Sequence, residues 1–186
     1  MRSKIRIRRV HEDGINFVDD APEIVIMKAG RGDKLVVEGG SIIYENGYYY
    51  LIYSVNGFAG PNYRVKVARS REVKIRYTLL KSFLNFSFFQ LETYFEEQFP
   101  DFLHTDYDRY NARLNCTFVG PGHGTPVKLE SGDYWYLYHA WKYGLVKQYP
   151  PGRVMNIDKI KWTEDGWPFI GIPSDTPMPV PVMKKH

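Results

Sequence analysis

Three residues stand in short contexts where their side chains could do chemistry: Glu38 in VEGG, His123 in GPGHG and Arg153 in GRVMNID. A carboxyl group can transfer protons, an imidazole can bind a metal or a hydroxyl, and a guanidinium can hold several oxygens. Taken alone, these contexts favour a solvent-facing carboxylate at a strand end, a loop histidine and a surface arginine. The elements that surround the three residues must therefore decide their roles.

The clearest structural signal follows Glu38. The stretch SIIYENGYYYLIYS places two strand-forming runs around Asn46-Gly47, a dipeptide suited to the positive φ angles of a type I′ hairpin turn. YRVKVARS, residues 63–70, predicts a third strand after a Gly- and Pro-containing loop. Earlier in the chain, turn signals separate three short strand candidates, at residues 4–10, 15–18 and 23–27.

The same order of elements returns further along the chain. GTPVKLESGDYWYLYHAW predicts a strand, a Gly-containing turn and an aromatic strand, and RVMNIDKIKWTEDGWPFI predicts two more strands around a TEDG turn. Repeated four-stranded sheets of this kind are typical of β-propeller blades, at about 40 to 45 residues each. We expect an all-β chain whose strands have one wetter face, because the aromatic residues mostly alternate with polar or β-branched neighbours.

Composition excludes several classes of protein. The 186 residues are 44% hydrophobic, which suffices for one core, and the net charge is +4. No stripe of Lys and Arg interleaved with stacking aromatics is present, so we expect no nucleic-acid partner. No run of 18 apolar residues occurs in the sequence, so we expect no membrane-spanning helix. Cys116 is the only cysteine, which excludes an intrachain disulfide.

Five motifs in one order carry a resemblance to a known family. VEGGSIIYENGYYYLIYSVNG, GPNYRVKVARS, FVGPGHGTPV, YWYLYHAW and GRVMNIDKIKWTEDGWPFIGIPSDTP together resemble the C-terminal part of glycoside hydrolase family 43. Members are five-bladed β-propeller enzymes that cleave arabinose- and xylose-containing polysaccharides. The resemblance runs from about residue 4 to residue 177. It implies a partial propeller of about three blades in a truncated domain over residues 1–177, followed by a proline-containing tail, 178–186.

The resemblance also implies roles for the three residues. Glu38 matches the general acid of the family's E-G-P motif, although Gly40 stands where the family usually has proline, which changes backbone stiffness after the acid. His123 matches the histidine at the propeller centre, which organises the site and in some members a calcium ion or its waters. Arg153 matches the arginine that reaches the sugar hydroxyls. We therefore expect substrate binding by His123 and Arg153 and a metal role for His123. We expect no required cofactor, and the resemblance allows a calcium ion at the propeller centre.

The family's inverting mechanism needs a second carboxylate as general base, and a third tunes the pKa of the acid. The resemblance places both in blades that precede this chain, and no local context supports the aspartates at 13, 19, 20 and 33. We expect the chain alone to have no appreciable hydrolase activity. The expected ligand is a pentose-containing polysaccharide or oligosaccharide, and the parent protein is expected to be secreted because such polymers lie outside cells. The alternative is a non-catalytic propeller fragment that binds carbohydrate or protein.

Residues 73–90, VKIRYTLLKSFLNFSFFQ, interrupt the resemblance. Their first and last residues could be encoded by codons that carry intron donor and acceptor sequences, with a pyrimidine-rich tract before the acceptor. We therefore hypothesise a retained intron. The alternative is a genuine insertion that forms an amphipathic helix, because Leu79, Leu80, Phe83 and Leu84 have helical spacing.

Overall fold

The computed structural model describes residues 2–30, 36–72, 96–97, 102–103, 105 and 117–177. The described part contains strands and no helix, so it also contains no helix long and apolar enough to cross a membrane. The all-β class is therefore confirmed, whereas the number of propeller blades stays a prediction. The interruption at 73–90, the tail at 178–186 and Cys116 lie outside the described residues.

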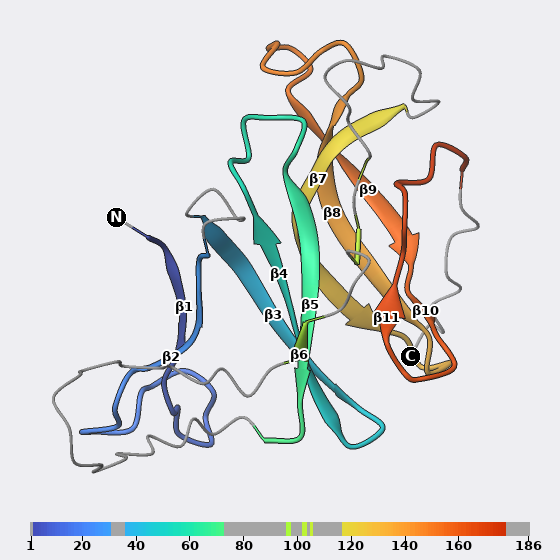
Figure 1. Ribbon diagram of the computed structural model, residues 1–186. Helices are drawn as coiled ribbons and strands as arrows, with labels where there is room; N and C mark the ends of the chain where they lie inside the picture. Colours follow the sequence, from blue (N-terminus) through green and yellow to red (C-terminus); the bar gives the residue numbers. More distant parts are fainter. Residues whose placement is uncertain are drawn as a thin grey trace, which may run out of the picture.

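The strands form four sheets, which are arranged beside one another (Figure 1). The first pairs β1 (Lys4–Ile7) with β2 (Ile24–Lys28). The second has the order β3 (Val37–Glu45), β4 (Tyr48–Val55), β5 (Arg64–Ser70) and β6 (Glu96–Glu97). The third has the order β7 (Phe118–Lys128), β8 (Tyr134–Lys142) and β9 (Arg153–Lys159), and a short hairpin pairs β10 (Lys161–Trp162) with β11 (Pro168–Phe169).

The hairpin predicted around Asn46-Gly47 is present between β3 and β4. Glu45 pairs with Tyr48, and the two turn residues have φ angles of 50° and 81°. These are the positive values that a type I′ turn requires. The predicted third strand follows as β5, and β6 completes a four-stranded sheet. The second unit departs from this plan, because β9 ends its sheet and the predicted last strands form the separate β10–β11 hairpin.

Strand β4 is buried on both faces over most of its length, which differs from the one wetter face expected from the sequence. Along β4, Tyr50 and Ile52 belong to a core shared with the β7–β9 sheet, whereas Leu51 and Tyr53 belong to a core shared with β1 and β2. All four are at most 1% exposed. Alternation of residue types separates the two faces of a strand, but it does not reveal that other sheets cover both faces.

The strand expected at residues 15–18 does not form, and this prediction was wrong. Only one isolated bridge, between Val10 and Phe17, is present there, and Ile15 is 81% exposed. The Asp13 carboxylate accepts hydrogen bonds from the backbone N–H groups of Ile15 and Asn16, at 2.9 and 3.1 Å. Such local side-chain to backbone bonds offer the chain an alternative to a strand ladder.

Candidate functional site

Glu38 is the second residue of β3, opposite Ser54 in β4. The pairing register shifts between Glu38 and Ser41, and Gly39 has a φ of +59°. Bulges of this kind redirect the side chains next to them. The Glu38 side chain is 34% exposed, so its carboxylate is held by the protein while it still meets solvent.

Tyr63, which immediately precedes β5, holds the Glu38 carboxylate. Its hydroxyl donates a hydrogen bond to Glu38 Oε1 at 2.7 Å, and the residue has no exposed surface. Burial raises the pKa of Tyr63 well above the ordinary value, and the hydrogen bond to Glu38 adds to this effect. The phenol therefore keeps its proton across the physiological range and acts toward Glu38 as a donor.

His123 approaches Glu38 from the neighbouring sheet. It lies in β7 where the register shifts between Gly122 and Thr125, and it has a φ of 52°, an uncommon conformation for a residue other than glycine. Its backbone N–H donates to Ser54 Oγ at 2.8 Å, which fixes β7 against β4. Its Nδ1 lies 4.0 Å from Glu38 Oε1, and its side chain is 54% exposed. The structure thus brings Glu38 and His123 together, although they are 85 positions apart in the chain.

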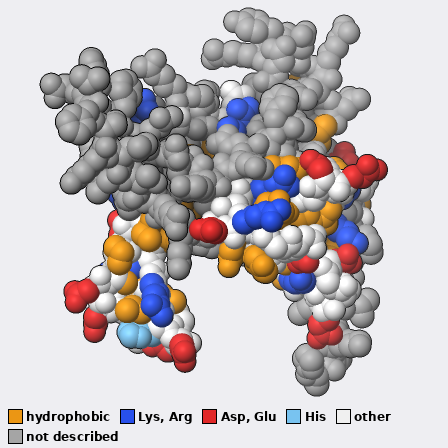
Figure 2. Space-filling view, turned by 60° about the horizontal axis from the view of Figure 1, so that its bottom comes forward, with side chains coloured by type: hydrophobic (Ala, Val, Ile, Leu, Met, Phe, Trp, Pro, Cys, Tyr) orange, Lys and Arg blue, Asp and Glu red, His pale blue; other side chains and the backbone are white. Residues whose placement is uncertain are grey.

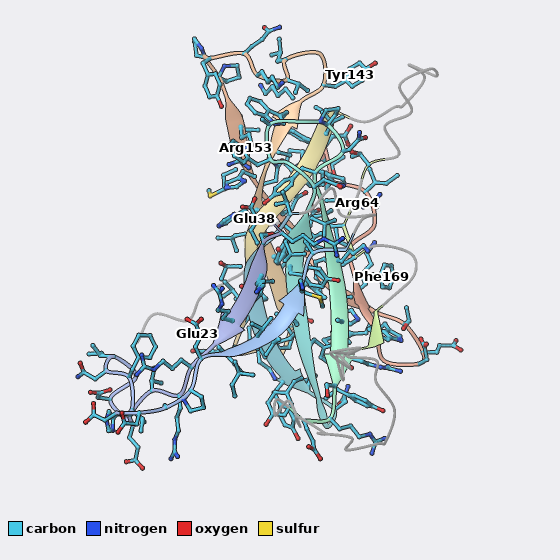
Figure 3. All side chains as sticks on the ribbon, turned by 60° about the vertical axis from the view of Figure 1, so that its left-hand side comes forward. Glu23, Glu38, Arg64, Tyr143, Arg153 and Phe169 are labelled. Carbon is cyan, nitrogen blue, oxygen red and sulfur yellow. The ribbon has the colours of Figure 1, made fainter. Side chains whose placement is uncertain are left out.

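Arg153 opens β9 in the same sheet as His123, and its guanidinium lies over the ring of Phe58, 5.0 Å from the centroid. Arg153 lies above Glu38 in Figure 3, and both are away from Glu23. The positive charge of Arg153 acts on a second histidine, His139 in β8, whose ring centroid is 5.9 Å from that of His123. Burial first, and then the charges of Arg153 and His123, lower the pKa of His139.

The side chains described above form one cluster: Glu38, Tyr63, His123, His139 and Arg153. Two nitrogen atoms of this cluster have no hydrogen-bond partner in the described part of the chain. They are Nη1 of Arg153 and Nδ1 of His139, and both are buried. A buried polar group without a partner costs free energy, so each is suited to a ligand group or a water. The cluster therefore joins a carboxyl group, a phenol, two imidazoles and a guanidinium, a set that can bind hydroxyls and transfer a proton.

The structure brings together Glu38, His123 and Arg153, the three residues singled out in the sequence. The sequence did not single out Ser54, Tyr63 and His139. Each of these three stands in or beside a strand whose residue pattern packing alone would explain. The pairing of β4 with β3 brings Ser54 to Glu38, and the pairing of β8 with β9 brings His139 into the same sheet as Arg153. A polar Ser54 in an otherwise apolar strand end was the one available signal.

The described residues do not by themselves fit a calcium ion at His123. Calcium takes six to eight oxygen ligands, and the groups around His123 are one carboxylate and several nitrogens. No group of three or more His, Cys, Asp or Glu side chains that could hold a metal occurs among the residues that the structure describes. A metal role for His123 stays a prediction, and we derive no step through a metal.

One family model matches part of the sequence. Residues 105–168 match the model of glycosyl hydrolases family 43. The resemblance to glycoside hydrolase family 43 is confirmed. The match includes His123 and Arg153 and does not reach Glu38. The roles of all three residues stay predictions. No curated protein matches the sequence significantly.

Three solved structures share the fold. The family 43 protein BlXynB from Bacillus licheniformis superposes with a TM-score of 0.64 and 20% identity, over 90% of this chain and 27% of that one. A xylan β-1,4-xylosidase from Bacillus halodurans gives 0.61 and 21%, over 96% and 31%. An α-L-arabinofuranosidase from Lactobacillus brevis gives 0.58 and 20%, over 88% and 44%. The chain thus spans less than half the length of each of these three proteins.

Proposed function

We propose that this chain supplies the general-acid half of a glycosidase site that acts on O-glycosyl bonds in arabinose- or xylose-containing polysaccharides. The family resemblance supports the reaction class, and the xylosidase and arabinofuranosidase among the similar structures support the substrate class. The observation that carries the proposal is the setting of Glu38, which is bonded by buried Tyr63, faces His123 and remains one-third exposed.

Glu38 in its protonated form donates to the glycosidic oxygen as the bond to the sugar carbon breaks. A second carboxylate on the opposite face of the sugar removes a proton from the attacking water, and inversion requires the two groups to be about 6.5 to 9.5 Å apart. We infer that this base is not among the 186 residues. His123 and Arg153 bind the sugar hydroxyls, for which the unpaired Nη1 of Arg153 is available.

Hydrolysis of aryl arabinofuranosides and aryl xylosides tests this proposal. We would compare the purified 186-residue chain with the protein encoded by the complete transcript that contains it. We expect turnover from the latter only. In that protein, Glu38→Gln is expected to lower kcat/KM by about 10²- to 10⁴-fold for substrates with poor leaving groups, and less for substrates with good ones, which need no acid.

Glu23→Gln is the matched control, because Glu23 makes an exposed ion pair with Arg6 in the β1–β2 region, outside the cluster. It should leave the kinetics unchanged. Turnover by the isolated chain would refute the inference about the base. A Glu38→Gln variant with full activity on poor leaving groups would refute the role of Glu38. If the complete protein binds arabino- or xylo-oligosaccharides without turnover, the non-catalytic binding fragment is correct instead.

A further inference from the structure

Tyr63 lies between Glu38 and the contact of β4 with β7. The N–H of His123 donates to Ser54 Oγ at 2.8 Å. Burial raises the pKa of Tyr63, and the Ser54 hydroxyl beside it acts in the opposite direction. The Tyr63 hydroxyl donates to Glu38 Oε1 at 2.7 Å, so the phenol hydrogen is directed at the carboxyl group.

The Tyr63 ring is held in one position by its surroundings. The residue has no exposed surface, and its ring occupies the space that a side chain on Gly122 would need. A Cβ at Gly122 would lie 2.1 Å from Tyr63 Cε1, far inside van der Waals contact. A phenol packed this closely against β7 has little freedom to turn away, so the hydrogen bond to Glu38 is preorganised.

The hydrogen bond makes the two carboxyl oxygens of Glu38 different. Oε1 accepts from Tyr63, and the nearest imidazole nitrogen, Nδ1 of His123, faces the same oxygen at 4.0 Å. A protonated carboxyl group has one O–H and one acceptor oxygen, and the oxygen that already accepts is the unfavourable place for the proton. The proton is therefore directed to Oε2.

We propose that Tyr63 is a positioning residue for the general acid, occupying Oε1 of Glu38 so that Oε2 delivers the proton to the leaving oxygen; this rests on the proposed function of Glu38. In the step, the Oε2 proton passes to the glycosidic oxygen, which keeps the electron pair of its broken bond to the sugar carbon. The oxygen of the activated water bonds to that carbon. Glu38 is left as a carboxylate, and Tyr63 keeps its own proton. The hydrogen bond strengthens as Glu38 becomes charged, which favours the transfer.

The test uses the 186-residue chain itself and needs no turnover. In Tyr63→Phe, the ring that fills the space beside Gly122 remains and only the hydroxyl is lost. The chemical shift of the Glu38 carboxyl carbon is followed by ¹³C NMR at pH 7. We expect this signal to move in Tyr63→Phe, because the carboxyl group loses its hydrogen-bond donor.

Tyr134→Phe is the matched control. It removes another tyrosine hydroxyl that donates to a glutamate, here Glu45 at 3.0 Å, at the far end of β3. The Glu38 signal should not move in this variant. If Tyr63→Phe does not fold, as judged by circular dichroism, Ser54→Ala takes its place, since it removes the hydroxyl beside Tyr63 and should move the signal by a smaller amount. A Glu38 signal that does not move in the folded variant would overturn the proposal.

The result of the Tyr63→Phe experiment can be distinguished from the result of the Glu38→Gln experiment that tests the proposed function. Full activity of Glu38→Gln in the complete protein would refute the acid role and leave the Tyr63 coupling measurable by NMR. In an active protein, Tyr63→Phe should lower kcat more than it raises KM, and most strongly for poor leaving groups. A change in KM alone would show that Tyr63 only shapes the binding surface, and would also overturn the proposal.

Discussion

Around Glu38, glycines bring strands of two sheets close enough for their side chains to meet. A Cβ on Gly39 would lie 3.2 Å from the His123 ring, and one on Gly122 would overlap the Tyr63 ring. Gly39 also has a positive φ, which other residues adopt rarely. The close approach of the functional side chains therefore requires glycine, with no side chain, at the positions next to them.

Gly122→Ala should destabilise the protein, because the added methyl group overlaps the buried Tyr63 ring. We expect a loss of about 1 to 3 kcal/mol in the free energy of unfolding, measured by urea denaturation followed by circular dichroism. Gly57→Ala is the control, since its Cβ would meet no atom within 4 Å and its φ is not positive. Equal stabilities of the two variants would contradict the tight contact between Gly122 and Tyr63.

The residues of the site were predictable to different degrees. Glu38, His123 and Arg153 could be singled out because each stands in a short motif with a family counterpart. Tyr63 could not, because its role depends on the hydrogen bond to Glu38, which forms only when β5 and β3 lie on either side of β4. A side chain that acts through tertiary contact leaves no local signal in the sequence.

At the scale of elements, local signals were reliable where the turn chemistry was specific. Asn46-Gly47 fixed the β3–β4 hairpin and its register, as its positive φ angles required. The strand predicted at 15–18 failed because the sequence reading treated Asp13 only as a turn residue. Its carboxylate in fact binds the residues that follow it, Ile15 and Asn16.

On the face seen in Figure 2, Lys and Arg side chains lie among hydrophobic and acidic ones over the described surface.

One ion pair links the ends of the two aromatic hairpins. Glu45, at the end of β3, accepts a hydrogen bond from Lys128 Nζ at 2.7 Å and another from the Tyr134 hydroxyl at 3.0 Å. The bond from Lys128 is the main cause that lowers the pKa of Glu45 below its ordinary 4.5. A carboxyl group with a lowered folded-state pKa stabilises the fold above its unfolded pKa, and this stabilisation is lost as pH falls through the folded one.

Glu45→Gln should therefore unfold at a lower temperature than the parent chain at pH 7, and the difference should disappear well below pH 4.5. Thermal unfolding followed across this pH range measures the effect, which should shrink in high salt because the pair is partly exposed. In a Lys128→Met background, Glu45→Gln should have a smaller effect. A difference that persists unchanged in acid would show that Glu45 acts through packing and not through its charge.

At the scale of the whole molecule, the β3–β6 sheet is shared by two cores. One core contains Leu51, Tyr53 and Val55 against β1 and β2, and the other contains Tyr50 and Ile52 against the β7–β9 sheet. Because adjacent residues of β4 serve opposite cores, neither core can lose β4 without the other losing it as well. The described sheets should therefore unfold as one cooperative unit.

Leu51→Ala tests this coupling, because Leu51 is 1% exposed and belongs to the core with β1 and β2. We expect a loss of about 2 to 5 kcal/mol. The sequence has four tryptophans, and none lies in the core with β1 and β2. Trp135 and Trp141 lie in β8, and Trp162 and Trp167 pack in the other core, so their fluorescence reports unfolding of the β7–β9 side. If the cores are coupled, the fluorescence midpoint in urea falls together with the circular dichroism midpoint. A fluorescence transition that stays at the parent value would show two independent cores, and Ile15→Ala, at an 81% exposed site, should move neither transition.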